Sequence, residues 1–150
     1  MPEQETLERA RRDKEQGKAP STQAGEFIRE EIHHIREGKH GARSAKQAIA
    51  IGLSKARRAG VNLPPPRKGS VSEKTRKSAA SAYRKGQRGQ RPSPKRSRAA
   101  VKALRHEGGR AASHTALARQ ARSAARRRGP ASRTAAAKKA GLTRSQERWA

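Results

Sequence analysis

Three histidines and a glutamate near the N-terminus have the residue types and spacing that could bind a metal ion. His33, His34 and His40 follow Glu30, and a helix would place Glu30 and His34, four residues apart, on one face. Zinc sites are normally recognised by a second ligand pair at fixed spacing, and the sequence contains none. We therefore expect ordinary surface histidines, with no metal and no cofactor.

The sequence lacks the usual arrangements of catalytic residues. It contains no cysteine, which removes disulfides, thiolate catalysis and zinc–cysteine sites. No serine, histidine and acid arrangement stands out, and no glycine-rich loop follows a predicted strand. The sequence therefore predicts that the protein is not an enzyme.

Lysine and arginine dominate the chemistry of the chain. Its 150 residues include 38 Lys or Arg and 12 Asp or Glu, a net charge of +26. Residues 1–66 carry net +4 and residues 67–150 carry net +22. Charge of this size favours a polyanionic partner, nucleic acid first and an anionic membrane second. The candidate nucleic-acid-binding residues are Lys46, Arg57, Arg58, Arg67, Lys68, Lys74, Arg76, Lys77, Arg84, Lys85, Lys95, Arg96, Arg98, Arg119, Arg122, Arg126, Arg127, Arg128, Lys138 and Lys139.

A helix over residues 44–60 is the element that the sequence specifies best. Ser44 and Gln47 form a capping box at its start. Gly60 suits the left-handed position after a helix, with Val61 as its apolar partner. Small residues recur every four positions and would let a partner helix approach closely: Ala48, Gly52 and Ala56.

A preceding helix over residues 22–37 would complete an αα-hairpin. Ile28, Ile32 and Ile35 share one helical face, and Gly38 ends the pattern. The hairpin, residues 21–63, is close to the size below which a domain needs outside help. We therefore expect a homodimer formed through the hairpin, with Ile51 as a candidate contact.

The remaining segments have few large apolar residues. Residues 1–20 read as a charged N-terminal tail with nothing to bury, residues 64–69 as a proline-rich linker, and residues 70–150 as an alanine-rich basic tail. Caps at Ser70 and Ser93 and a break at Gly129–Pro130 indicate short helices. The expected fold is mostly α, with a small hairpin over about 22–60 and a largely disordered tail that becomes helical on binding a polyanion.

Two segments carry resemblances to known proteins. The run from Gln47 to Gly60, preceded by residues 27–38, resembles a bacterial family of small basic proteins of uncharacterised function, over roughly residues 25–61. Members are sometimes labelled DNA-binding or plasmid-stabilisation proteins, so the resemblance implies DNA binding but supplies no site residues. The tail resembles linker-histone tails, with Ser-Pro-Lys-Arg at residues 93–96 similar to their minor-groove motif.

The leading functional hypothesis is non-specific DNA binding through phosphate contacts, by a nucleoid-associated or plasmid-maintenance-type protein. The alternatives are an RNA- or ribosome-associated protein, and a scaffold whose hairpin docks a partner protein. A membrane-active peptide is a weaker alternative, because the basic helices lack a broad apolar face and no apolar run approaches the roughly 18 residues of a membrane span. We expect no membrane partner and a cytoplasmic, nucleoid location.

Overall fold

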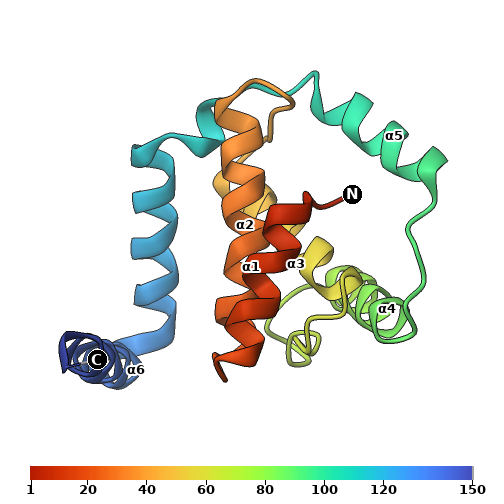
Figure 1. Ribbon diagram of the computed structural model, residues 1–150. Coiled ribbons are helices and arrows are strands. Elements are labelled where there is room, and N and C mark those ends of the chain that lie inside the picture. Colours follow the sequence, from red (N-terminus) through yellow and green to blue (C-terminus); the bar gives the residue numbers. More distant parts are fainter. Residues whose placement is uncertain (150) are drawn as a thin grey trace. The chain divides into compact units, whose positions relative to one another are not determined.

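A computed structural model describes residues 1–149 and shows a helical chain, drawn in Figure 1. Within these residues the only β-type pairing is an isolated bridge between Lys68 and Val71. The contacts divide the chain into two units, Met1–Ser113 and a second that begins at His114. The helices are α1 (Gln4–Glu15), α2 (Pro20–Arg36), α3 (Ala45–Arg58), α4 (Glu73–Gln87), α5 (Pro94–Leu104), a 3-10 turn (Arg110–Ala112) and α6 (His114–Trp149).

The charged N-terminal segment is a packed helix, although the sequence predicted a tail with nothing to bury. Helix α1 lies along α2 (Figure 1) and buries Thr6 and Ala10 against it. The Glu3 amide donates to Glu30 Oε1 at 2.6 Å, which ties the start of α1 to α2. Thr6 and Ala10 are small, so their burial leaves only a faint hydrophobic pattern in the sequence.

The predicted hairpin is confirmed as α2 and α3, and its caps follow the expected chemistry. The Ser44 hydroxyl accepts the Gln47 amide at 3.1 Å. The Gln47 side chain accepts the Arg43 amide at 2.6 Å rather than that of Ser44. At the other end, the Val61 amide donates to the Ala56 carbonyl at 3.1 Å, as in a Schellman motif.

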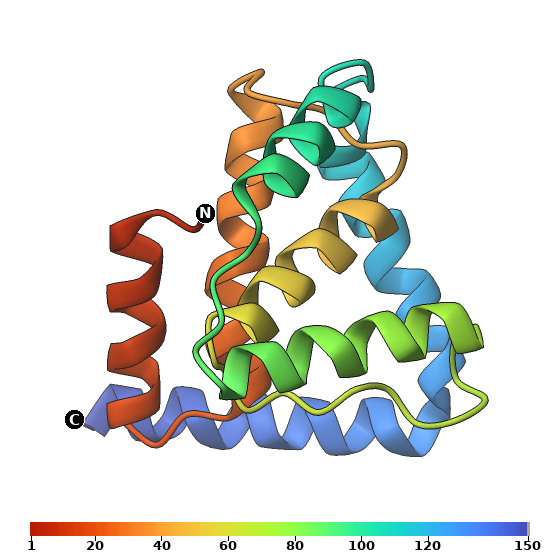
Figure 2. The ribbon, with the colours of Figure 1, turned by 90° about the vertical axis from the view of Figure 1, so that its right-hand side faces the viewer.

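Close backbone approach joins α2 and α3, which cross obliquely in Figure 2. A Cβ on Gly52 would lie 2.7 Å from Ile28 Cα, so only glycine fits at this crossing. Alanines fill most of the surrounding core, and the main large side chain is Phe27, which is 1% exposed. Two apolar clusters result, one around Phe27 and Ala56 and the other around Ile35 and Ala48.

The prediction of a largely disordered tail is wrong, and helix α4 is the first part of the structure that contradicts it. This helix packs on α3, and a Cβ on Gly86 would lie 1.7 Å from the Arg57 carbonyl oxygen. It begins two residues later than the expected capping box, because Ser72, not Ser70, accepts the Thr75 amide, at 3.2 Å. The connection from α3 to α4 therefore includes residues 59–72.

The segment after α5 also belongs to the first unit. The Gly41 amide donates to the carbonyl of Leu104, the last residue of α5, at 2.9 Å, and the Ala42 amide donates to the Gly108 carbonyl at 3.1 Å. Ala112 is 1% exposed in the cluster around Ile35, and residues beyond the hairpin thus complete the hairpin's core. Because one chain covers the hairpin in this way, its small size no longer requires a second copy.

The second unit is a long helix rather than a disordered segment. Helix α6 buries none of its described residues. Gly129, at φ 81° and ψ 170°, interrupts it before Pro130, where the sequence predicted a break. Helical geometry then continues through Gly141 to Trp149. Among the described residues, no helix has the length and apolar character needed to span a membrane.

Candidate functional site

A groove lined by basic side chains lies in the first unit, between the C-terminal parts of α3 and α4 and the start of α5. Its volume is about 670 Å³. The charged side chains that line it are Arg58, Lys85, Arg91 and Arg96, and the lining contains no acidic residue. We call these four side chains and the space between them the basic groove. In Figure 1, α5 stands clear of α3 and α4 and is joined to α4 by residues 88–93.

Local chain geometry positions the α5 side of the basic groove. Gln90 donates its amide to the Lys85 carbonyl at 3.0 Å and turns the chain away from α4. Ser93 caps α5 by accepting the Arg96 amide at 3.5 Å, and Pro94 follows at the first helical position, as the sequence predicted. The start of α5, with its partial positive charge, therefore lies at the groove.

The charge of the basic groove is not neutralised within the described chain. No carboxylate in residues 1–149 forms an ion pair with any of its four basic side chains. Arg58 and Lys85 are half-buried, whereas Arg91 and Arg96 are exposed. The four positive charges repel one another, so the groove favours binding of an anion that contacts several of them at once.

The basic groove brings together three of the predicted nucleic-acid-binding residues, Arg58, Lys85 and Arg96. It adds Arg91, which the sequence reasoning missed although it lies two residues before the predicted cap of α5. Several other predicted residues of the first unit lie outside the groove lining and are exposed: Lys46, Arg67, Lys68, Lys74, Lys77, Arg84, Lys95 and Arg98. Those of the second unit are exposed along α6: Arg119, Arg122, Arg126, Arg127, Arg128, Lys138 and Lys139.

Two predicted phosphate contacts are engaged within the protein. Arg57 is 7% exposed, and its guanidinium donates to the carbonyls of Leu63 and Pro64 at 3.1 and 3.3 Å. Burial lowers the pKa of Arg57, and the side chain fastens the proline-rich connection to α3. Arg76 pairs with Glu73 at 3.0 Å on the surface of α4.

A second group of polar side chains lies where α2 meets the connection to α3. It consists of Glu31, His34 and His40, which we call the histidine–glutamate cluster. His40 Nε2 lies 3.0 Å from Glu31 Oε2, and His34 Nδ1 lies 4.0 Å from Glu31 Oε1. The expectation of surface histidines is wrong for His34 and His40, whose side chains are 12% and 6% exposed. It holds for His33, which is exposed.

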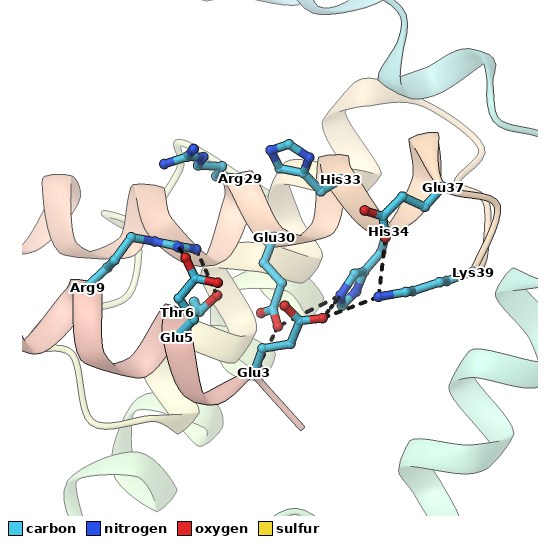
Figure 3. Close-up of a pocket in the computed structure, with 10 residues that line it drawn as sticks. All are labelled: Glu3, Glu5, Thr6, Arg9, Arg29, Glu30, His33, His34, Glu37 and Lys39. Atoms are coloured by element: carbon cyan, nitrogen blue, oxygen red, sulfur yellow. Dashed lines mark hydrogen bonds and ion pairs between the residues drawn. The ribbon is translucent and has the colours of Figure 1, made fainter.

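A pocket of about 280 Å³ opens beside this cluster, and Figure 3 shows its lining. Glu3 enters it from the start of α1, and Glu3 Oε1 accepts hydrogen bonds from His34 Nε2 at 2.9 Å and from Lys39 Nζ at 3.3 Å. These two contacts, chiefly that with His34, lower the pKa of Glu3. Figure 3 also shows Glu30 and His34 converging on Glu3.

Comparison with known proteins gives a family match and no assigned activity. Residues 3–68, from α1 to the proline-rich connection, match the model of a family of unknown function (DUF6496). The matched range includes the segment on which the bacterial resemblance rested, and it ends before α4 and α5. No curated protein and no solved structure matches the chain.

Proposed function

We propose that the protein binds DNA non-specifically and that the basic groove receives backbone phosphates. The observation that carries this proposal is the convergence of four basic side chains from α3, α4, α5 and the connection before α5, with no acidic residue in the groove lining. Phosphate oxygens would relieve the repulsion among these side chains and release counterions from the DNA. The exposed lysines and arginines of α6 would add further contacts of the same kind.

The side chains around the basic groove are better suited to phosphates than to bases. Of the aromatic residues of the first unit, Phe27 is buried in the core and Tyr83 lies outside the groove lining, so neither offers a stacking surface in the groove. Sequence-specific recognition of single-stranded RNA normally uses such stacking. Duplex DNA is therefore the favoured partner, and structured RNA is the second candidate. Binding of this kind suits a nucleoid-associated or plasmid-maintenance role.

The test compares two double variants that remove equal charge from different faces. Arg91→Gln with Arg96→Gln alters the basic groove, whereas Arg12→Gln with Arg29→Gln removes exposed charge from α1 and α2. Affinity for a short duplex is measured by fluorescence anisotropy over a range of salt concentrations. Each lost phosphate contact should reduce the slope of log affinity against log salt by about 0.9.

The groove variant should bind duplex DNA more weakly and with a smaller salt slope, while the control variant stays close to the wild type. Equal losses in both variants would show that net charge alone controls binding and would overturn the groove proposal. Competition between the duplex and structured RNA of equal length decides the partner. Preference for RNA would replace DNA with the second candidate.

A further inference from the structure

The hydrogen bonds around the histidine–glutamate cluster determine which nitrogen of each histidine is free. His40 Nδ1 lies 2.9 Å from the Gly41 carbonyl, which can only accept, so Nδ1 carries a proton. His34 Nε2 lies 2.9 Å from Glu3 Oε1 and donates to it. In their neutral forms, both histidines therefore keep a lone pair on the other nitrogen, His40 Nε2 and His34 Nδ1.

Those two lone pairs lie next to a buried carboxylate that is itself incompletely satisfied. The Glu31 side chain is 1% exposed. Lys55 Nζ contacts its Oε1, but its Oε2 is buried and accepts no hydrogen bond, although His40 Nε2 lies 3.0 Å away. Buried carboxylate oxygens without a partner are rare in folded proteins, and a bound water or ion is a common explanation.

We propose that Glu31, His34 and His40 bind a divalent transition-metal ion, with zinc as the best match. The donor atoms of the three residues all lie within 4.8 Å of one another. Two imidazoles and one carboxylate are a donor set that zinc accepts, with a fourth position left for water. The ion would meet both free lone pairs and the unsatisfied oxygen at once.

The local sequence and the surroundings fit this chemistry. Glu31 and His34 form a Glu-x-x-His pair on α2, a spacing that places two ligands on one helical face. Glu3 acts on His34 as the outer carboxylate of a carboxylate–histidine–metal triad, and the Gly41 carbonyl has the same role for His40. Glu30, with its own buried and unsatisfied Oε2, adds negative charge nearby.

The main alternative occupant of the cluster is a proton. A doubly protonated His40 would pair with Glu31, as Lys55 does. That pairing would use His40 Nε2, which lies 3.0 Å from Glu31 Oε2 and is the same atom that a metal ion would contact, so the two occupants exclude each other. The two occupants also differ in their response to added metal.

The test is titration of the chelator-treated full-length protein with Zn²⁺ by calorimetry and with Co²⁺ by visible absorption. We expect one ion per chain and a Co²⁺ spectrum of tetrahedral type. His34→Gln and His40→Gln should each weaken binding by at least about tenfold, and Glu3→Gln by about 10–100-fold. His33→Gln removes the adjacent exposed histidine and should bind like the wild type.

A measurement on the unmodified protein keeps the proposal testable if a variant fails to fold. Imidazole nitrogen resonances followed by NMR during Zn²⁺ addition should shift for His34 and His40, most strongly at His34 Nδ1 and His40 Nε2. His33, His106 and His114 should remain unchanged. The proposal would be overturned if Zn²⁺ did not bind one-to-one, or if the variants of His34 and His40 bound it as tightly as the wild type. Unshifted resonances of these two residues would overturn it as well.

Discussion

Arg57 and Arg58 are neighbours of identical type with different environments. The sequence assigns both to phosphate binding, because nothing local separates them. In the structure, Arg57 is buried and donates to the backbone of the proline-rich connection, while Arg58 lines the basic groove. The difference arises from the tertiary packing of residues 63–64 on α3.

This difference predicts opposite effects of the same substitution at the two positions. Arg57→Gln should lower the free energy of unfolding by about 1.5–3 kcal/mol, because it breaks the hydrogen bonds from the buried, charged guanidinium to the backbone carbonyls of Leu63 and Pro64. It should leave the salt slope of DNA binding nearly unchanged. Arg58→Gln should reduce that slope with little effect on stability. Urea unfolding measures the free energy of unfolding, and anisotropy titrations measure the salt slope. If the two substitutions changed both quantities equally, the separate roles of the two arginines would be contradicted.

Glu3 predicts a pH-dependent contribution to stability. Its pKa is lowered below the ordinary value of 4.5, so the folded state favours the carboxylate. The resulting stabilisation is present above pH 4.5 and is lost as the pH falls through the lowered pKa. Glu3→Gln should therefore be less stable than the wild type near neutral pH, and the difference should shrink in acid.

Urea midpoints between neutral and acidic pH measure this effect, in chelator-treated protein. Glu15→Gln, exposed at the end of α1, is the control for loss of one negative charge. A constant difference between Glu3→Gln and the wild type at all pH values would show that the carboxylate charge is not what stabilises this contact.

At the scale of the elements, the sequence predicts helices more successfully than it predicts their packing. The α3 helix has strong caps and a clear small-residue face, and both are observed. The packing of α1, α4 and residues 104–112 could not be predicted from large apolar residues, because their contacts use Thr6, Ala10, Ala82, Gly86 and Ala112. Small side chains stabilise these contacts through close backbone approach, which hydrophobic periodicity does not reveal.

The candidate sites could not be predicted from the sequence either, because both depend on how separate segments pack together. The sequence identifies most basic residues of the groove individually, but the groove exists only because α4 and α5 are folded. The histidine–glutamate cluster depends on His40, which lies in the connection between α2 and α3. No helical spacing relates that position to Glu31.

Close approach at Gly86 predicts a large effect from one methyl group. A Cβ at this position would lie 1.7 Å from the Arg57 carbonyl oxygen. Gly86→Ala should therefore destabilise the first unit by about 1–3 kcal/mol through overpacking, despite the higher helix propensity of alanine. Gly25→Ala in α2 is the matched control, because nothing lies within 4 Å of its added Cβ.

The control should stabilise the protein by about 0.5–1 kcal/mol, since alanine replaces glycine inside a helix without a clash. Thermal and urea unfolding of both variants measure the difference. If Gly86→Ala were as stable as Gly25→Ala, the packing of α4 on α3 would be contradicted.

At the scale of the whole molecule, the structure places α6 in a helix without nucleic acid. The full-length protein should therefore show strong helical circular dichroism alone, and saturating duplex DNA should change it little. Trp149 is 86% exposed and is the only tryptophan, so its fluorescence reports separately whether α6 meets the DNA. A large gain of helix on DNA addition would contradict a preformed α6.

The most direct test of the central claim asks whether DNA covers the basic groove. The chain contains no cysteine, so Ser97→Cys places one thiol in the groove lining and Ser21→Cys places one at the exposed start of α2. The rate of thiol alkylation is measured with and without saturating duplex DNA. We predict slower alkylation at position 97 and an unchanged rate at position 21. Equal rates at position 97 with and without bound DNA would contradict the assignment of the basic groove as the nucleic-acid site.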